Sequence, residues 1–554
     1  MTTHKFSLLS ILLFILSYLS ISCRNHTPIQ NIPNDINSQF VYSKKSNQLF
    51  YSSNDSNLYH IYQLDLSKTH FKKKLIKIPL KEDVFVRDIS YNGRFLSFVS
   101  DYNGNQKYDI YLYDLKNHKY ISITSTIEID DGNPQFSPTE DKLAYLSDGK
   151  LIIYDIQKHQ ALYKSDETFK SLLWTKNKIY LEKVNSDIVA LDPKFYSFSK
   201  IWESPKESFV PKMFFFKDDS LCFISDHDGF SQIFILNTIK SKTNNPIQLN
   251  YDLYEPQLDH NGSLHFIANM DGSLKKFKLN KNNQIIPDIN FEDGVLYQYY
   301  IDKNREIYLS ASIDSPKSIY LKFNSKLKKL PINDHKIKAS NYQRFITKDG
   351  MSHFIFTPKD TMKIKDYVVW LHGGPNEQVS PRYNPIINSL NEKGYGVICI
   401  NYKGSTGIGN SYEMRDNNGT KTYINQIKNI KKNLNYISKM LNHKAKLKFI
   451  SVSYGSILAH GYTAIYPNEV SKIVDISGLT DTKINSLIND VPSTLKILFI
   501  SGDNDFALNQ YKLDLIEKYD DAKTEQLIIE KEGHYIRRKN SLIKLINRTI
   551  NFLD

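Results

Sequence analysis

A short strand-like pattern recurs through the first half of the chain and constrains its fold more than any other feature. Each copy has alternating apolar residues that in most copies end at a small residue, as in Leu96-Ser-Phe-Val-Ser100 and Leu221-Cys-Phe-Ile-Ser225. A period of about 43 residues is typical of β-propellers, in which each blade has four strands. The seven copies begin at Leu49, Leu96, Leu143, Ile179, Leu221, Leu264 and Ile307.

The residues around each copy also fit a propeller blade. Turn-forming sequences such as Ser90-Tyr-Asn-Gly93 precede the copies, and a polar turn and a second strand follow, as in Asp109-Ile-Tyr-Leu-Tyr-Asp114. We therefore expect a seven-bladed β-propeller over residues 36–335, with eight blades or a β-sandwich as alternatives. The fourth copy departs most from the pattern, because it contains Glu182 and Lys183. The 37 Tyr and 30 Phe suit this strand-rich fold, since half-buried strands favour aromatic rings.

After about residue 336 the pattern changes, and apolar strand-like runs alternate with helical stretches. This alternation predicts an α/β domain with a mostly parallel sheet over residues 336–554. The expected strands are 368–371, 397–400, 447–452, 473–476, 497–500 and 526–529, and the clearest helices are 423–441 and 456–466.

Three residues of this second domain follow strands in the order of an α/β-hydrolase triad. Ser453 lies between the strand 447–452 and a helix, which is the position of a nucleophile elbow. The acid and the base of such enzymes come later in the chain, and Asp505 and His534 each follow a later strand. We expect His534 to take the Ser453 proton and Asp505 to orient the imidazole. Asp503 is the competing acid.

Two glycine-bearing loops follow earlier strands of the same sheet, His372-Gly-Gly-Pro375 and Asn401-Tyr-Lys-Gly-Ser-Thr-Gly-Ile-Gly409. Glycines there let the backbone pass close to a bound carbonyl. With the triad, these loops resemble the H-G-G-P and N-Y-R-G-S-x-G-Y-G motifs of the prolyl oligopeptidase family, especially its acylaminoacyl-peptidase branch. The repeats of the first half also resemble those of TolB-like and prolyl-oligopeptidase propellers.

The resemblance implies serine-dependent cleavage of short peptides through an acyl-enzyme, at a site between the two domains to which the propeller restricts access. It further implies that the Tyr454 backbone N–H, with Gly373 and Gly374, binds the oxyanion and substrate. The residues do not decide whether the enzyme prefers a substrate with proline, with an acylated N-terminus or with an apolar residue. They also leave open whether it acts as an endopeptidase or as an exopeptidase. The alternatives are an esterase of small acyl esters and a decayed binding protein.

Several positions depart from the family motifs. The most consequential is Ile408, where many relatives have a tyrosine that donates the second oxyanion hydrogen bond; losing such a donor costs about 10² to 10³ in rate. We expect either that Tyr402 or Tyr412 substitutes or that the enzyme is slow. The other departures are Lys403, Ser451, Ser456 and Ser501.

The first 22 residues have the pattern of an export signal. A short polar start with Lys5 precedes an apolar stretch that is short for a membrane span, and Cys23 follows it. The segment resembles a bacterial lipoprotein signal, so we expect an exported protein anchored in a membrane through lipidated Cys23, with residues 23–35 as a linker. Ordinary secretory cleavage and an uncleaved anchor are the alternatives.

The remaining composition favours no other partner. The net charge is +13, but Lys72–Lys74 and Arg537–Lys539 are the longest basic runs, so no basic stripe indicates nucleic-acid binding. Cys222 and Cys399 lie singly in apolar runs and are expected to be buried thiols rather than a disulfide. We expect no metal and no cofactor. The sequence does not indicate an oligomeric state.

Overall fold

The computed structural model describes residues 27–554 except 69, 140–141, 206–211, 218–219, 290, 292, 304, 334–336, 338–339, 414–419, 489–491 and 520–523. The expected signal segment with Cys23 lies outside the described residues, as does the expected boundary at residue 336. None of the described helices is long and apolar enough to cross a membrane.

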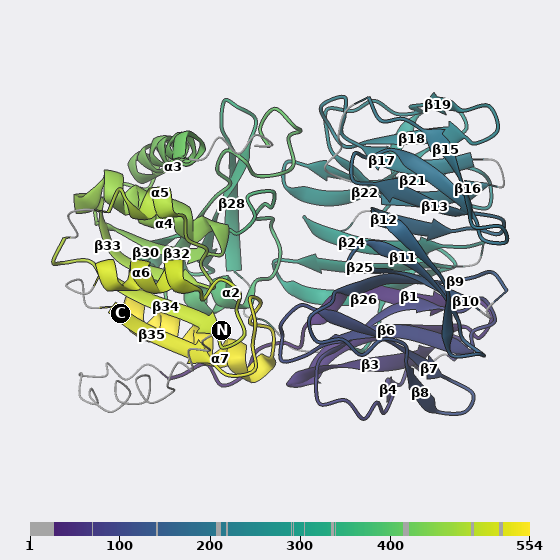
Figure 1. Ribbon diagram of the computed structural model, residues 1–554. Coiled ribbons are helices and arrows are strands. Elements are labelled where there is room, and N and C mark those ends of the chain that lie inside the picture. The colour runs from purple at the N-terminus through teal and green to yellow at the C-terminus, as the bar shows by residue number, and fades with distance from the viewer. Residues whose placement is uncertain are drawn as a thin grey trace.

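The described strands between residues 36 and 329 form seven antiparallel units of four strands, as expected for a seven-bladed propeller (Figure 1). The first blade contains β1 (Ile36–Ser43), β2 (Gln48–Ser56), β3 (Leu58–Asp65) and β4 (Lys74–Leu75), and the second contains β5 (Val84–Ile89), β6 (Phe95–Asp101), β7 (Tyr108–Asp114) and β8 (Lys119–Ser122). The third and fourth comprise β9 (Asp131–Phe136), β10 (Lys142–Ser147), β11 (Lys150–Asp155), β12 (Gln160–Trp174), β13 (Ile179–Lys183), β14 (Ile188–Asp192) and β15 (Ser197–Trp202). The long β12 belongs to both, because it pairs first with β11 and then with β13.

The last three blades continue the same pattern. The fifth contains β16 (Lys212–Lys217), β17 (Ser220–Ser225), β18 (Gln232–Asn237) and β19 (Lys242–Asn244). The sixth contains β20 (Leu253–Leu258), β21 (Leu264–Met270), β22 (Ser273–Leu279) and β23 (Ile285–Pro287), and the seventh β24 (Gly294–Ile301), β25 (Glu306–Ser312), β26 (Ser315–Phe323) and β27 (Lys326–Lys329).

The seven sequence copies occupy equivalent places in this ring, because they are the second strands β2, β6, β10, β13, β17, β21 and β25. The divergent fourth copy is also a strand, and its Glu182 is buried. Burial raises the pKa of Glu182 to about 7, although the hydroxyl of Ser171 donates a hydrogen bond of 3.0 Å to this carboxyl and lowers it. The deviation in sequence therefore places one carboxyl in the interior of the blade, and β13 still pairs with both neighbouring strands.

The ring closes by side-chain contacts between the first and last blades. The Phe40 backbone N–H donates to the Gln298 side chain (2.7 Å), and the Gln298 amide donates back to the Phe40 carbonyl (3.2 Å). Other glutamines bridge neighbouring blades in the same way, with Gln135 donating to Leu172 O at 2.8 Å. These side chains give hydrogen-bond partners to backbone groups where two blades meet without sharing a strand.

The second domain is a mixed eight-stranded sheet with helices on both faces. The strand order is β28-β29-β31-β30-β32-β33-β34-β35, and the strands from β31 to β35 along this order are parallel. Their bounds are β28 Ser340–Ile346, β29 Ser352–Pro358, β30 Asp366–Leu371, β31 Tyr395–Ile400, β32 Leu447–Val452, β33 Val470–Ile476, β34 Lys496–Gly502 and β35 Thr524–Ile529.

Helices pack on each face of this sheet over a separate apolar core. The core on one face includes residues of α3, α4, α5 and α6, and the core on the other includes residues of α2 and α7. The expected α/β-hydrolase architecture is thus present, beside the propeller (Figure 1). The helices are α2 (Pro385–Glu392), α3 (Thr420–Met440), α4 (Tyr454–Ile465), α5 (Thr482–Asn485), α6 (Gln510–Lys518) and α7 (Lys539–Leu553), and the 3-10 turns are η1 (Thr361–Lys363) and η2 (Pro467–Glu469).

Candidate active site

Ser453 lies on a sharp turn between β32 and α4, as the sequence predicts. Its backbone has φ 49° and ψ −120°, a region that costs a non-glycine residue about 1 to 3 kcal/mol. Two hydrogen bonds hold it there: the Ser453 N–H donates to Ile476 O and the Leu479 N–H donates to Ser453 O, both at 3.0 Å. The turn is therefore fixed by β33 and the loop after it.

Close packing explains which residues around Ser453 are small. A Cβ on Gly455 would lie 2.5 Å from the carbonyl oxygens of both Leu371 and His372, so α4 can begin against the end of β30 only with glycine there. Ser451 and Ser456, which replace the expected glycines, are buried, and their hydroxyls form a hydrogen bond of 3.0 Å. These two departures from the motif leave the turn intact.

The structure brings Ser453, His534 and Asp505 into one hydrogen-bonded chain. Ser453 Oγ lies 2.9 Å from His534 Nε2, and His534 Nδ1 lies 2.8 Å from Asp505 Oδ1. Asp505 is 5% exposed and His534 9% exposed, and the Ala507 N–H also donates to Asp505 Oδ1 at 2.8 Å. The competing Asp503 is exposed, and its carboxylate accepts a hydrogen bond from Asn504 instead.

The loop containing Gly373 lies directly beside the nucleophile. A Cβ on Gly373 would lie 3.3 Å from Ser453 Cβ. The residue after the nucleophile, Tyr454, is the first residue of α4, so its backbone N–H is the first N–H group of that helix. The Tyr402 hydroxyl fixes this loop by donating to the carbonyls of His372 (2.8 Å) and Gly373 (3.2 Å). Gly374, next in the loop, has φ +113°, which favours glycine.

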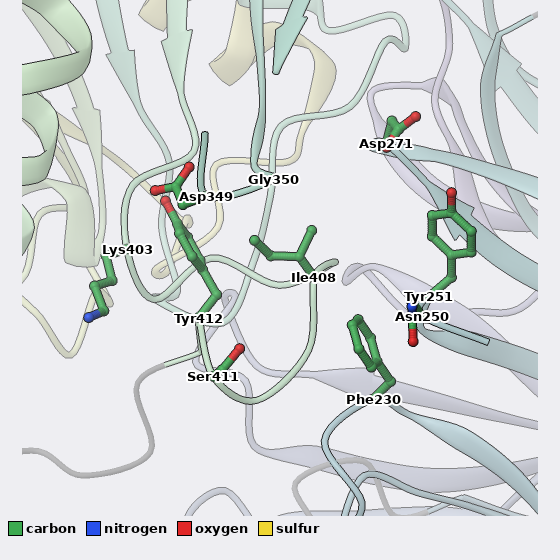
Figure 2. Close-up of a pocket in the computed structure, with 10 residues that line it drawn as sticks. All are labelled: Phe230, Asn250, Tyr251, Asp271, Asp349, Gly350, Lys403, Ile408, Ser411 and Tyr412. Carbon is green, nitrogen blue, oxygen red and sulfur yellow. The ribbon is translucent and has the colours of Figure 1, made fainter. Parts of the chain in front are cut away.

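Ile408 stands where the family motif has a tyrosine, and its apolar side chain supplies no hydrogen-bond donor. It lines a cavity of about 500 Å³ between the two domains, together with Phe230 and Tyr251 of the propeller and Tyr412 (Figure 2). The Tyr412 hydroxyl donates to Asn401 O at 3.2 Å, and the Tyr402 hydroxyl binds the loop carbonyls. Both tyrosine hydroxyls thus donate to backbone carbonyls in this structure.

The turn that carries His534 is attached to the second propeller blade. Arg537 Nε lies 3.0 Å from Asp83 Oδ2, and the same guanidinium pairs with Asp101. Arg538 pairs with Glu82 at 2.9 Å. Burial alone would lower the pKa of Arg537, but Asp101 and Asp83 outweigh it and raise that pKa. The sequence does not predict this contact between the domains. The basic run after His534 is the one feature of the sequence that could have indicated it.

Two aromatic residues beside His534 were also not identified from the sequence. Phe506 follows Asp505 and Tyr535 follows His534 in the chain, and both rings contact the imidazole. Nothing in their spacing marks them, because single aromatic residues in loops are common.

The other expected features have ordinary structural roles. Cys222 and Cys399 are buried free thiols, and burial raises the pKa of each. Within the described part of the chain, no group of three or more His, Cys, Asp or Glu residues could hold a metal ion.

No family model matches this sequence, and no curated protein matches it either. Solved structures match nearly the whole chain. An acylaminoacyl peptidase from Pyrococcus horikoshii matches with a TM-score of 0.71 and 14% identity, covering 94% of this chain and 95% of its own.

Two further solved structures agree with this match. A puromycin-hydrolyzing peptidase from Mycobacterium tuberculosis has a TM-score of 0.74 and 14% identity over 93% of this chain and 94% of its own. A prolyl endopeptidase structure has a TM-score of 0.76 and 13% identity over 94% of this chain and 89% of its own. The chain therefore has the propeller and α/β-hydrolase fold of the prolyl oligopeptidase-type peptidases.

Proposed function

We propose that this protein is a serine peptidase that hydrolyses short peptides through an acyl-enzyme. The observation that carries the proposal is the chain of hydrogen bonds from Ser453 through His534 to Asp505, at 2.9 Å and 2.8 Å. The strained backbone of Ser453 supports it, because strain in a well-packed fold is concentrated at functional sites. The solved structures of this fold include acylaminoacyl and puromycin-hydrolyzing peptidases.

In this mechanism Ser453 Oγ attacks the scissile carbonyl while His534 Nε2 takes its proton. Asp505 holds the imidazole in the required tautomer and stabilises its positive charge. The Tyr454 N–H and the backbone of the Gly373–Gly374 loop stabilise the oxyanion. His534 then gives the proton to the leaving amine, and a water molecule activated by His534 hydrolyses the acyl-enzyme.

The position of the propeller favours short peptides as substrates. Its second blade contacts the turn of His534 through Arg537, and a Cβ on Gly533 would overlap the Gly104 carbonyl oxygen. A propeller held this close to the triad should exclude folded proteins from Ser453 more strongly than short extended peptides.

The test is turnover of a mixed library of short peptides by the purified protein, with Ser453→Ala as the inactive variant. Ser486→Ala is the matched control, because Ser486 is exposed at the end of α5. We expect peptide cleavage that is abolished by Ser453→Ala and retained in the control. Turnover of small esters without any peptide would favour the esterase, and no serine-dependent turnover would favour a decayed scaffold.

We also propose export and anchoring through a lipid on Cys23. The apolar stretch that ends at Cys23 supports this proposal. Metabolic labelling with a fatty-acid analogue should mark the wild-type protein and not Cys23→Ser. Label retained in that variant would contradict the anchor.

A further inference from the structure

Two largely exposed aromatic rings contact the imidazole of His534. The ring centroids of Phe506 and His534 are 4.4 Å apart, and those of Tyr535 and His534 are 5.7 Å apart. Phe506 is 62% exposed and Tyr535 64% exposed. An exposed aromatic ring is common alone, but two rings against one reactive group form a surface that apolar groups can cover.

The backbone holds both rings in fixed positions relative to the site. Phe506 stands between Asp505 and Ala507, and the Ala507 N–H binds the Asp505 carboxylate at 2.8 Å. Tyr535 directly follows His534 in a turn attached to the propeller through Arg537. The backbone positions of the two rings are thus set by residues adjacent to the triad.

The chemistry of the proposed reaction puts the leaving group on this side of the site. The leaving amine receives its proton from His534 Nε2, so it must lie within hydrogen-bond reach of that atom. The residue that carries this amine therefore lies next to the imidazole, and its side chain is close to the two flanking rings.

We propose that Phe506 and Tyr535 form the subsite for the first residue of the leaving peptide, and that this subsite takes an apolar or aromatic side chain. The inference rests on the proposed peptidase function and adds its leaving-side specificity. Aromatic side chains bind such a surface because offset or edge-to-face ring pairs add to the apolar area they bury.

The propeller limits how far this subsite extends. Asn504 Nδ2 donates to Asn103 O at 3.3 Å, and Gly533 packs against Gly104. The propeller loop 102–105 therefore contacts residues two positions before each ring in the chain. We expect this loop to limit the leaving peptide to a few residues.

Acyl transfer to added amines measures this subsite separately from the acyl side. The enzyme is acylated by the methyl ester of an amino acid, free or N-acetylated, whichever it turns over. The amine then attacks the acyl-enzyme carbonyl, its C–N bond forms as the bond to Ser453 Oγ breaks, and His534 passes the amine proton to Ser453 Oγ. Mass spectrometry gives the ratio of transfer product to hydrolysis product for phenylalaninamide, leucinamide, glycinamide and lysinamide.

We expect the wild-type protein to transfer to phenylalaninamide in preference to glycinamide. Phe506→Ala should reduce that preference by about threefold to tenfold, the range of one aromatic contact, and Phe506→Leu should restore part of it. Phe195→Ala is the matched control, because Phe195 is 69% exposed in the turn between β14 and β15; its preference should equal that of the wild type.

Two results would overturn the inference while leaving the peptidase proposal standing: equal transfer to all four amines by the wild type, or a preference that persists in Phe506→Ala combined with Tyr535→Ala. Absence of Ser453-dependent ester turnover before any amine is added would instead overturn the proposed function, and this inference with it.

Discussion

Removing the ammonium group of Lys512 should destabilise the second domain by leaving a buried carboxylate unpaired. Asp475 is fully buried at the end of β33, 2.6 Å from Lys512 Nζ and 2.8 Å from His460 Nε2. Burial alone would raise the pKa of Asp475, but Lys512 and His460 outweigh it and lower the pKa to about 2. Breaking a buried ion pair on one side typically costs about 3 to 5 kcal/mol, which is the loss we expect for Lys512→Met.

The double variant Lys512→Met with Asp475→Asn should recover much of that loss, because it removes the uncompensated charge. Urea denaturation followed by tryptophan fluorescence measures both, since Trp370 is buried in this domain. Lys439→Met on the exposed side of α3 is the matched control. A loss below about 1 kcal/mol, or an equal loss in the single and double variants, would refute the reasoning.

The ion pair of Asp475 and Lys512 also predicts how the free energy of unfolding changes with pH. Because the folded pKa of Asp475 lies below the unfolded value of about 3.9, its contribution to stability is present above that pH and is lost as pH falls toward 2. The difference between wild type and Lys512→Met should therefore shrink in acid. Lys512 has a second contact close to the nucleophile, because its ammonium group donates to Gly478 O at 3.1 Å. The next residue, Leu479, donates its backbone N–H to Ser453 O.

Two further predictions follow from other buried groups. Arg537→Ala should lower kcat for peptides by roughly tenfold, with a smaller change in KM, because it frees the turn of His534 from the propeller; unchanged steady-state kinetics would contradict this. Burial lowers the pKa of His353 to about 4 and also lowers that of His372 and His460, so the unfolded state takes up protons at a higher pH than the folded state does. The free energy of unfolding should fall as pH drops below about 6.5, and a urea midpoint equal at pH 7 and pH 5 would contradict it.

Much of the fold could be predicted because its signals are local and repeated. The strand copies of the propeller recur at nearly constant spacing, and even the divergent copy at Glu182 keeps the strand. The order of Ser453, Asp505 and His534 after strands of a parallel sheet predicts that they meet at one edge, as they do.

The contacts between the domains could not be predicted in this way. Arg537 meets Asp83 and Asp101 across more than four hundred residues of sequence, and no period connects them. The family motif marks Ile408, but it does not predict that the side chain faces the cavity between the domains. The positions of Phe506 and Tyr535 could not be predicted either, because only the structure shows that both rings contact the imidazole of His534.

The most direct measurement of the central claim is the intact mass of the protein after reaction with a fluorophosphonate. We predict a single adduct on Ser453, formed in the wild type, absent from Ser453→Ala and nearly absent from His534→Ala, since the hydroxyl needs its base. Asp505→Asn should react roughly 10⁴-fold more slowly. No adduct on the wild type, or an adduct that persists in Ser453→Ala, would contradict the account.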